Sequence, residues 1–563
     1  MTRLVGLFLA TALCAQNILP LRDVRPGMRG TGRTIFSGST IEEFQAEILG
    51  VLENAGPKQS IILARLSGGP LATSGVLQGM SGSPVYIDGK LIGAVALGFA
   101  FSKEPIAGIR PIEEMLRSDA PRPAQARTLD ELAQNRPEFG AGSNKLIDIS
   151  TPLALGGFTR AAIQHFTPQL RALGLEPMQG AAGGATTRGR PVSIQPGSMI
   201  SVQLATGDLN VAADGTVTHI DGDRIYAFGH QFLSTGPTDM PFARSEVLAL
   251  LPNVNTSFKI SAAREWIGSI TADHNTAIAG RIGRKAVTVP VSIAVKGRDT
   301  YKLQLVDDRL LTPFLLQMAT YSSIDATDRT TGSSTVDVKG RIRFAQGPAV
   351  TIDNTYASET NVPLLASLAA TIPLSYAMQS GFPEFKPTAV DLEIDVRDDR
   401  NLLRVEQLWT SRNRVRPGES FDAHLLLSGP GGKEIRRRVQ YQVPIGAPAG
   451  QLQITAADAM TTNIAEFASI LTQPPSTAAR VTEILNGLRG NSTATLRIAR
   501  VDPAFTVQGR HLPDPPPSLA LLLRNDPGAA APAAVSKLAS YDFPIDGWVV
   551  TGARTTYVQI QEQ

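Results

Sequence analysis

The segment VLQGMSGSPVYIDGKLIGAV, residues 76–95, contains the two signals from which we infer the fold. Asp88 and Gly89 stand between two apolar runs, and this pair favours a tight β-hairpin because glycine accepts the positive φ that such turns require. The glycine-rich stretch before the hairpin, residues 78–84, is typical either of an ordinary turn or of a sharp loop that exposes a reactive serine. The segment therefore predicts a hairpin with a candidate reactive loop at its entrance.

A second stretch, DGTVTHIDGDRIYAFGH at residues 214–230, repeats the Ile-Asp-Gly hairpin. Residues 86–94 and 219–227 are identical at five positions. Such hairpins recur by chance in β proteins, so this similarity alone leaves two interpretations open. We favour two related β-units, 17–118 and 151–285, packed as half-barrels with a cleft between them, because each hairpin lies beside a segment suited to chemistry.

The composition limits the class of protein. A chain of 563 residues predicts three or four domains, and its 51 glycines and 39 prolines favour a mostly β fold with many turns. The formal net charge is only +3 and no basic stripe is visible, so we expect no nucleic-acid partner. The single cysteine excludes a disulfide framework or a cysteine-based zinc site. No cluster has the spacing of metal ligands, and we predict neither a metal nor a cofactor.

Residues 1–15 have the pattern of a secretory signal peptide. Arg3 precedes an apolar run of about ten residues, which is too short to span a bilayer and is followed by small residues. The alternatives are a lipoprotein signal that uses Cys14 and a buried N-terminal helix. We expect an exported protein, periplasmic or extracellular, with association to the cell envelope as a further option. We expect no integral membrane segment after removal of the signal.

The rest of the chain divides by composition. We expect a linker after the first β-unit, a β-rich domain with a helix, a small β-sandwich-like domain and an α+β C-terminal region. These accessory regions, residues 286–563, offer a surface for a protein partner. The predicted boundaries are 1–15 for the signal, 17–118 and 151–285 for the two β-units, 119–150 for the linker, and then 286–389, 390–450 and 451–563.

Ser81 and His230 are the candidate catalytic residues. A nucleophilic serine needs a backbone bend and amides that point at the developing oxyanion, and glycines at 79 and 82 permit that bend. The amides of Gly79 and Ser81 would then form the oxyanion hole. Of the six histidines, His230 alone ends a hairpin next to a glycine, in YAFGHQF at residues 226–232, which suits a base exposed in a cleft.

Both segments resemble one family. Residues 76–95 closely resemble the nucleophile segment of the SpoIVB-type serine peptidases, the stage-IV sporulation protein B family of exported, trypsin-like signalling proteases. Residues 214–230 resemble the histidine segment of that family. The resemblance spans roughly residues 20–285. It implies a trypsin-like double β-barrel with Ser81 as nucleophile, His230 as general base and the amides of Gly79 and Ser81 at the oxyanion.

The chain departs from the family pattern in two ways. The histidine segment of the sporulation members precedes the serine segment, so the two halves are expected to be permuted here. The family's aspartate lies about fifteen residues before the serine, where this chain has Leu66, and residues 54–87 contain no carboxylate. We take Asp239 as the candidate acid, with Asp221 and Asp223 as alternatives.

We therefore predict an exported serine endopeptidase that cleaves a protein or peptide substrate. Ser81 attacks the peptide carbonyl, and His230 takes its proton and passes it to the leaving amine. The alternative is a catalytically inactive binding or scaffold protein of the cell envelope on the same fold. The unassigned acid and the long accessory region favour that alternative, whereas the intact glycine frame around Ser81 favours the enzyme.

Overall fold

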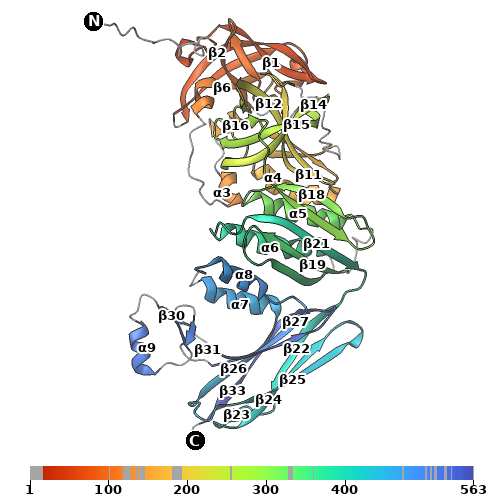
Figure 1. Cartoon of the computed structure of the whole chain (residues 1–563), viewed down its shortest axis with the longest axis vertical. Helices are drawn as coiled ribbons and strands as arrows, with labels where there is room; N and C mark the ends of the chain where they lie inside the picture. The colour runs from red at the N-terminus through yellow and green to blue at the C-terminus, as the bar shows by residue number, and fades with distance from the viewer. Residues whose placement is uncertain are drawn as a thin grey trace, which may run out of the picture. The chain divides into compact units, whose positions relative to one another are not determined.

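The structure is a computed structural model of the chain, and the chain divides into two compact units, whose helices and strands are labelled in Figure 1. Unit 1 comprises Met1–Ser292 and Tyr301–Ser322, and unit 2 comprises Ile293–Thr300 and Ser323–Gln563. The predicted export signal, residues 1–15, lies outside the described residues. The structure describes residues 17–56, 58–99, 102–117, 128–134, 138–139, 146–180, 193–253, 257–327, 334–358, 361–471, 475–500, 504–507, 510–512, 516–524, 529–533 and 536–561.

The first sheet of unit 1 closes into a six-stranded antiparallel ring. β4 pairs with both β1 and β5, so the order β4-β1-β2-β3-β6-β5 returns to its start. The short strands β8 and β7 extend the sheet beyond β5. The strands are β1 (Arg29–Ser37), β2 (Thr40–Gly56), β3 (Gln59–Ser67), β4 (Pro84–Ile87), β5 (Lys90–Phe99), β6 (Ile106–Pro111), β7 (Glu138–Phe139) and β8 (Leu146–Asp148).

An apolar core fills this ring. Phe44, Ile62, Val95 and Ile109 are completely buried in one cluster. The ring of Phe44 lies directly on Gly32, where a Cβ atom would stand only 2.1 Å from Phe44 Cζ. Burial of large apolar side chains is the main favourable term in folding, so these alternating inward residues hold the ring closed.

The second sheet of unit 1 also contains a six-stranded antiparallel ring. β11 pairs with both β12 and β14, which closes the order β12-β13-β16-β15-β14-β11. β9 and β10 extend the sheet from β12, and β18 pairs with β11. The strands are β9 (Thr151–Gly156), β10 (Leu175–Gln179), β11 (Met199–Gly207), β12 (Asn210–Asp221), β13 (Arg224–Ala227), β14 (Gly236–Leu251), β15 (Phe258–His274), β16 (Ala277–Ile282) and β18 (Tyr301–Val306).

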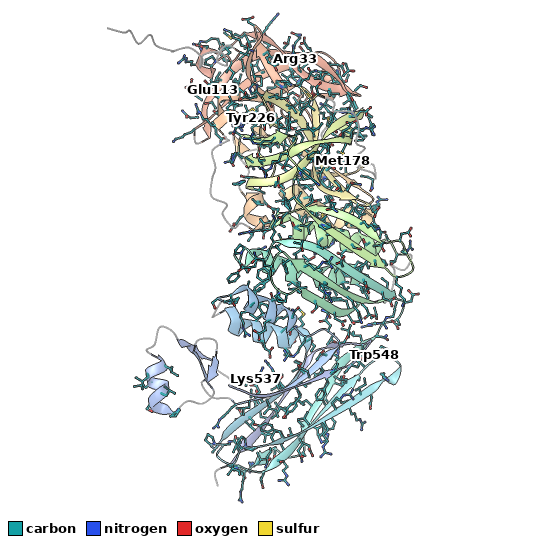
Figure 2. The ribbon with its side chains drawn as sticks, viewed as in Figure 1. Arg33, Glu113, Met178, Tyr226, Lys537 and Trp548 are labelled. Atoms are coloured by element: carbon teal, nitrogen blue, oxygen red, sulfur yellow. The ribbon has the colours of Figure 1, made fainter. Side chains whose placement is uncertain are left out.

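The two rings of unit 1 share an apolar cluster. Leu91 and Ala94 of β5 pack with Tyr226 of β13 and with Ala277 and Ala279 of β16. Figure 2 labels Tyr226, which brings its ring from the second sheet into this contact. The cluster lies beside both Ile-Asp-Gly hairpins, so it fixes the hairpins relative to each other.

The two hairpins form as the sequence predicts. β4 and β5 are joined at Asp88 and Gly89, which both have positive φ, at 49° and 75°. Successive positive φ values define the turn that matches the twist of two-residue hairpins. β12 and β13 are joined at Asp221 and Gly222, and Gly222 has φ 60°.

Helices cover the edges of unit 1. Helix α4 begins after Thr159, whose hydroxyl accepts a hydrogen bond from the Ala162 amide. Phe166 of α4 makes edge contacts with Phe314 and Tyr321 of α5, which join the two helices. The helical segments are η1 (Leu21–Asp23), α1 (Leu71–Ser74), α2 (Ile112–Leu116), α3 (Leu129–Gln134), α4 (Arg160–Ala172) and α5 (Leu311–Asp325), the last of which ends in unit 2.

Unit 2 begins with a helix on an antiparallel layer. β17 (Thr288–Val295) spans the unit boundary, and β21 (Pro387–Arg397), β19 (Ser334–Phe344) and β20 (Val350–Ser358) follow side by side. Helix α6 (Val362–Gln379) lies on β19 and β20. By length and composition α6 is apolar enough to cross a membrane, and half of it is buried within the protein.

A β-sandwich forms the rest of unit 2. The sheet β25-β24-β22-β32 faces the sheet β23-β33-β26-β27-β31, and Phe421 of β24 packs with Ile454 of β26 in the core between them. Trp548, labelled in Figure 2, packs against a second cluster of this sandwich. The strands are β22 (Leu402–Thr410), β23 (Arg414–Val415), β24 (Ser420–Ser428), β25 (Glu434–Gln442), β26 (Gly450–Asp458), β27 (Thr493–Arg500), β31 (Ser536–Pro544), β32 (Val549–Thr551) and β33 (Ala553–Ile560).

Smaller elements complete unit 2. They are η3 (Pro430–Gly432), α7 (Ala459–Leu471), α8 (Ala478–Asn486) and α9 (Pro517–Arg524), with a three-stranded sheet of β28 (Ala504–Val507), β29 (Arg510–Leu512) and β30 (Ala529–Ala533).

The prediction of a mostly β chain is confirmed, with a sandwich that is wider than expected. The sequence places a small sandwich within residues 390–450, yet four of the five strands of its second sheet, β26, β27, β31 and β33, lie between residues 450 and 560. The physical reason is that β22, β24 and β25 form one layer, and the apolar face of one layer needs a second sheet to cover it.

Candidate active site

The loop around Ser81 joins α1 to β4 and requires glycine at two places. Gly79 has φ +88° and Gly82 has φ +91°. A Cβ atom at Gly82 would lie 2.0 Å from the Thr216 carbonyl oxygen and 2.5 Å from the Phe228 amide nitrogen. The loop therefore presses its backbone against the second ring of strands, and only a residue without a side chain fits at Gly82.

The amides of this loop alternate between bonded and unbonded. The Met80 amide donates to the Leu77 carbonyl at 3.1 Å and the Gly82 amide donates to the Val95 carbonyl at 2.7 Å. The amides of Gly79 and Ser81 have no acceptor among the described residues. Two unbonded N–H groups that flank Met80 are what an oxyanion hole requires.

The side chain of Ser81 is fully enclosed. None of its surface is exposed, and its Oγ makes no hydrogen bond to any residue that the structure describes. The Ser81 carbonyl accepts the Thr216 amide at 2.8 Å, which ties the loop to β12. In this state Ser81 is therefore not hydrogen-bonded to a base.

His230 follows β13 in a backbone turn of unusual conformation. Phe228 has φ +71° and Gly229 has φ +73°, and a bulky residue with positive φ is strained. The Phe228 amide donates to the Thr216 carbonyl at 3.2 Å, and Thr216 is the residue whose amide binds Ser81. The structure thus brings the Ser81 loop and the segment before His230 to one residue of β12.

The imidazole of His230 has a defined tautomer. The ring is completely buried, and its Nδ1 lies 2.7 Å from the Gln231 carbonyl oxygen. A carbonyl oxygen only accepts hydrogen bonds, so Nδ1 is the donor and bears a proton. A neutral ring in this tautomer has its lone pair on Nε2, which is the atom that a general base uses.

Two buried charged residues hold the backbone on either side of His230. The carboxylate of Asp273 accepts the amides of Phe232 at 2.9 Å and of Leu233 at 2.7 Å. Burial raises the pKa of Asp273, and these amide hydrogen bonds oppose the rise. On the other side, Arg110 Nε donates to the Gly229 carbonyl at 3.4 Å. Neither residue could be predicted from the sequence, because no spacing relates them to His230.

Asp239, the acid predicted from the sequence, lies on β14 with other partners. Its carboxylate accepts the Ser269 hydroxyl and the Val287 amide, and Arg284 Nε is 3.5 Å from it. Of the two alternatives, Asp223 pairs with Arg281 at 2.8 Å at the exposed end of the hairpin. The role of Asp239 in catalysis stays a prediction.

A buried lysine lies under the oxyanion candidates. A Cβ atom at Gly79 would stand 3.2 Å from Lys259 Cδ, and Lys259 Nζ donates to Thr34 Oγ1 at 2.8 Å. Burial lowers the pKa of Lys259 to about 7, although the charges of Asp214 and Glu42 act in the opposite direction. Burial raises the pKa of Asp214, and serine hydroxyls and Lys259 oppose that rise. Lys259 and Asp214 are therefore both buried, and the charge of each influences the pKa of the other.

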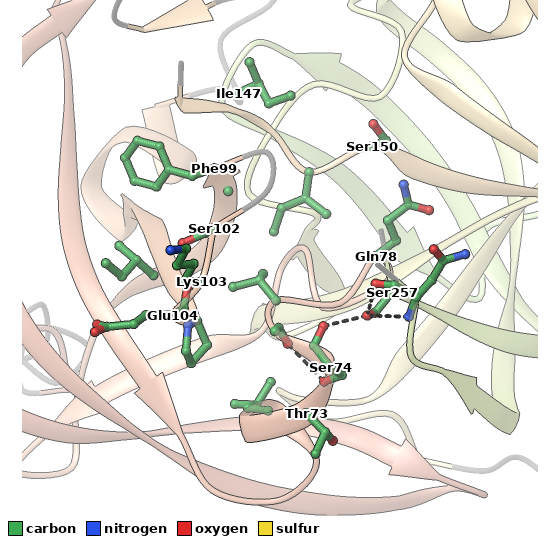
Figure 3. A pocket seen from close by; sticks show the side chains of 18 of the residues that line it. Thr73, Ser74, Gln78, Phe99, Ser102, Lys103, Glu104, Ile147, Ser150 and Ser257 are labelled. Carbon is green, nitrogen blue, oxygen red and sulfur yellow. Dashed lines mark hydrogen bonds between the residues drawn. The ribbon is translucent and has the colours of Figure 1, made fainter. Parts of the chain in front are cut away.

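A pocket of about 510 Å³ opens beside the approach to the loop (Figure 3). Gln78, three residues before Ser81, lines it together with Phe99, Ile147 and Ser150. Figure 3 shows Ser257 and Ser74 close to Gln78, and the Ser257 hydroxyl donates to the Ser74 carbonyl at 2.6 Å. Gln78 Oε1 is buried and makes no hydrogen bond to the described residues. The pocket is lined by neither Ser81 nor His230.

The described residues contain no group of three or more His, Cys, Asp or Glu side chains that could hold a metal ion. The loop of Ser81 instead offers two unbonded amides, lies on Lys259 at Gly79, and shares Thr216 with the segment before His230. This arrangement suits proton transfer and stabilisation of an oxyanion.

Comparison with known proteins gives one match. No curated protein and no solved structure matches the chain. The one match is to a protein-family model. It covers the first ring and includes Ser81, whereas His230 lies outside the matched residues, in the second ring. Residues 18–116 match the family model described as SpoIVB peptidase S55, which makes this part of unit 1 similar to a serine peptidase.

Proposed function

We propose that the protein is an exported serine endopeptidase of the SpoIVB type, with Ser81 as nucleophile and His230 as general base. The observation on which this rests is the loop at residues 78–82. Within a segment similar to a peptidase family, it combines a serine with two unbonded amides, and it contacts the same residue of β12 as the segment before His230.

The reaction follows from these groups. Ser81 Oγ attacks the carbonyl carbon of a peptide bond while His230 Nε2 takes the hydroxyl proton. The carbonyl oxygen becomes negatively charged and accepts hydrogen bonds from the amides of Gly79 and Ser81. His230 then protonates the leaving amine, and water hydrolyses the acyl-enzyme by the same steps. A general base contributes about 10²–10⁴-fold and one oxyanion donor about 10²–10³-fold to the rate.

The substrate is a protein or peptide that opens the site as it binds. Ser81 and His230 are both enclosed, so neighbouring groups must move before a peptide bond reaches Ser81. Catalytic hydrogen bonds in substrate-free enzymes often tighten only in the complex, which is consistent with the unbonded Ser81 Oγ. The pocket beside Gln78 is the proposed place for a substrate side chain.

The architecture proposed for unit 1 is a trypsin-like double barrel whose serine half precedes its histidine half. The two closed six-stranded rings support it, because Ser81 enters from the first and His230 from the second. We place the protein in the periplasm or outside the cell on the basis of residues 1–15. Residues 286–563 then serve to bind a protein partner.

A catalytically inactive scaffold is the second candidate. The enclosure of Ser81 and the absence of a bond between its Oγ and any described residue favour it. Under this alternative the loop is a structural contact between the two rings. The two candidates differ in whether Ser81 reacts with an electrophile that requires an activated serine.

The test is labelling of the purified full chain with a fluorophosphonate probe, beside the variants Ser81→Ala, His230→Ala and Ser83→Ala. Ser83 is the matched control because it lies in the same loop, is equally buried and also has an unbonded Oγ among the described residues. We expect labelling of the wild type and of Ser83→Ala, and none of the other two. A folded wild-type protein that stays unlabelled would favour the scaffold.

A further inference from the structure

One peptide group stands between His230 and Asp273. The carbonyl of Gln231 accepts from His230 Nδ1 at 2.7 Å, and the amide of Phe232 donates to Asp273 Oδ1 at 2.9 Å. These two backbone atoms belong to the same planar unit, in which the C=O and N–H bonds of a trans peptide point in opposite directions. The imidazole and the carboxylate therefore lie on opposite sides of one peptide, in a continuous row of hydrogen bonds.

The position of Asp273 in the second ring is rigid. Asp273 lies near the end of β15, where it pairs with Gly236 of β14 and Ile278 of β16. Its side chain is 1% exposed, and its second oxygen, Oδ2, accepts the amides of Leu233 and Thr235. One oxygen thus binds the peptide next to the imidazole, while the other holds the following turn.

We propose that Asp273 is the acidic positioning residue for His230, and that it acts through the Gln231–Phe232 peptide instead of touching the imidazole. This inference rests on the proposed peptidase function. It assigns to Asp273 the task that a directly bonded aspartate performs in a catalytic triad, which is to fix the tautomer and stabilise the imidazolium. Atoms and charges balance because no proton leaves the peptide: the proton from Ser81 moves to Nε2 and from there to the leaving amine, and Nδ1 keeps its own.

The physical basis is cooperativity between hydrogen bonds. A carboxylate that accepts the Phe232 amide polarises the peptide and makes the Gln231 carbonyl oxygen a stronger acceptor. A stronger acceptor at Nδ1 raises the basicity of Nε2 and lowers the energy of the positively charged ring that forms during attack. The hydrogen bonds from His230 Nδ1 to the Gln231 carbonyl and from the Phe232 amide to Asp273 also hold the imidazole in one orientation. A Gln231 carbonyl whose peptide was not fixed by Asp273 would not do so.

The first experiment is proton and nitrogen NMR of the full chain labelled with ¹⁵N-histidine. We expect one strongly downfield Nδ1–H signal that exchanges slowly with water and disappears in His230→Gln. In Asp273→Asn we expect this signal to move upfield or to broaden. In the control Thr235→Val, which removes a hydroxyl 3.4 Å from Oδ2 but leaves Oδ1 and the peptide intact, we expect no change.

The second experiment measures the rate of fluorophosphonate labelling against probe concentration in the same variants. We expect Asp273→Asn to lower the maximal labelling rate about 10²-fold, with a half-saturating concentration within about twofold of wild type. This loss is smaller than the roughly 10⁴-fold loss seen for a directly bonded triad aspartate, because the peptide still orients the ring. Thr235→Val should label within about twofold of wild type, and Asp273→Glu should recover part of the rate.

The outcomes separate the two proposals. A wild-type chain that is never labelled but shows the protected Nδ1–H signal, sensitive to Asp273→Asn, overturns the peptidase and keeps the relay. A folded Asp273→Asn with wild-type spectrum and labelling rate overturns the relay and keeps the peptidase. If Asp273→Asn does not fold, the wild-type spectrum decides, since a rapidly exchanging Nδ1–H contradicts the relay. Loss of labelling in Asp239→Asn together with an unaffected Asp273→Asn would transfer the role to Asp239.

Discussion

Gly82 is the residue at which the contact between the two rings is tightest. A Cβ atom there would overlap the Thr216 carbonyl oxygen at 2.0 Å, so Gly82→Ala must push the Ser81 loop away from β12. We expect it to lower the free energy of unfolding by at least about 3 kcal/mol and to abolish fluorophosphonate labelling. Urea unfolding of unit 1 and the labelling assay measure the two effects.

Gly89 provides the matched control for that substitution. It also has positive φ, at +75°, but nothing lies within 4 Å of a Cβ atom placed there. Gly89→Ala should therefore cost only about 1 kcal/mol, from backbone strain, and should leave labelling intact. Equal effects of the two substitutions would contradict the argument that the close approach to Thr216 matters.

Lys259 makes the stability of unit 1 depend on pH. Its pKa falls from 10.5 in an exposed lysine to about 7 in the folded chain. Between these values the unfolded chain binds a proton at Lys259 that the folded chain does not bind, so the free energy of unfolding rises with pH. The cost of burying the charge is fully present below pH 7, at roughly 5 kcal/mol, and disappears as the pH approaches 10.5.

The variant Lys259→Met isolates this effect because it keeps the length of the side chain and removes the titration. Between pH 7.5 and 10 the wild type should gain about 3 kcal/mol of unfolding free energy relative to Lys259→Met. Calorimetry of the unit 1 transition across this range measures the difference. A difference that does not change with pH would mean that Lys259 keeps its ordinary pKa in the folded chain.

At this scale the sequence offers as candidates only residues that lie within motifs, and it gives no sign of residues that come close to them through space. Ser81 and His230 stand in glycine-rich segments whose turn chemistry is local, so their surroundings could be read directly. Asp273 and Lys259 reach the site only because β15 lies alongside the Ser81 loop and the turn after His230. No rule of spacing relates residue 273 to residue 230, and a lysine on an alternating strand is expected to face solvent.

Among the elements, the hairpins could be predicted from adjacent residues, whereas the ring closures could be expected only from the family resemblance. An Asp-Gly pair between apolar runs defines a hairpin from a few adjacent residues. Closure of the first ring depends on two residue pairs between β1 and β4, Thr31 with Tyr86 and Gly32 with Val85, which are more than 50 positions apart in the chain. Such pairings are set by the packing of the whole core, which the pattern of one strand does not reveal.

The pocket beside Gln78 gives a prediction about specificity. Ser150 lines this pocket near Gln78 (Figure 3), so Ser150→Trp would fill part of its 510 Å³. We expect the variant to react at least about tenfold more slowly with a peptidyl phosphonate that bears a bulky apolar side chain, because the tryptophan would occupy the part of the pocket that this side chain of the reagent needs. Reaction with a small fluorophosphonate should stay within about twofold. Parallel loss with both reagents would show that the pocket does not select the substrate.

In the whole molecule, the candidate site is divided between two rings. The segment similar to the peptidase family ends at residue 116, within the first ring and its flanking helix, and His230 comes from the second. Neither ring alone contains both a nucleophile and a base, and the apolar cluster of Leu91, Tyr226 and Ala277 joins them. If Ser81 and His230 act together as proposed, all of unit 1 is the minimal catalytic body, and we expect the strands of unit 2 to be dispensable for chemistry.

Paired core substitutions test this division. Ile109 is completely buried in the first ring and Ile454 is completely buried in the sandwich of unit 2, so each change to alanine opens a cavity that costs about 2–5 kcal/mol. Ile454→Ala should lower only the unfolding transition of unit 2 and leave the labelling rate of Ser81 within about twofold. Ile109→Ala should lower the transition of unit 1 and reduce labelling near its midpoint. If Ile454→Ala instead removes labelling at temperatures where unit 1 is folded, the sandwich takes part in forming the reactive state of Ser81.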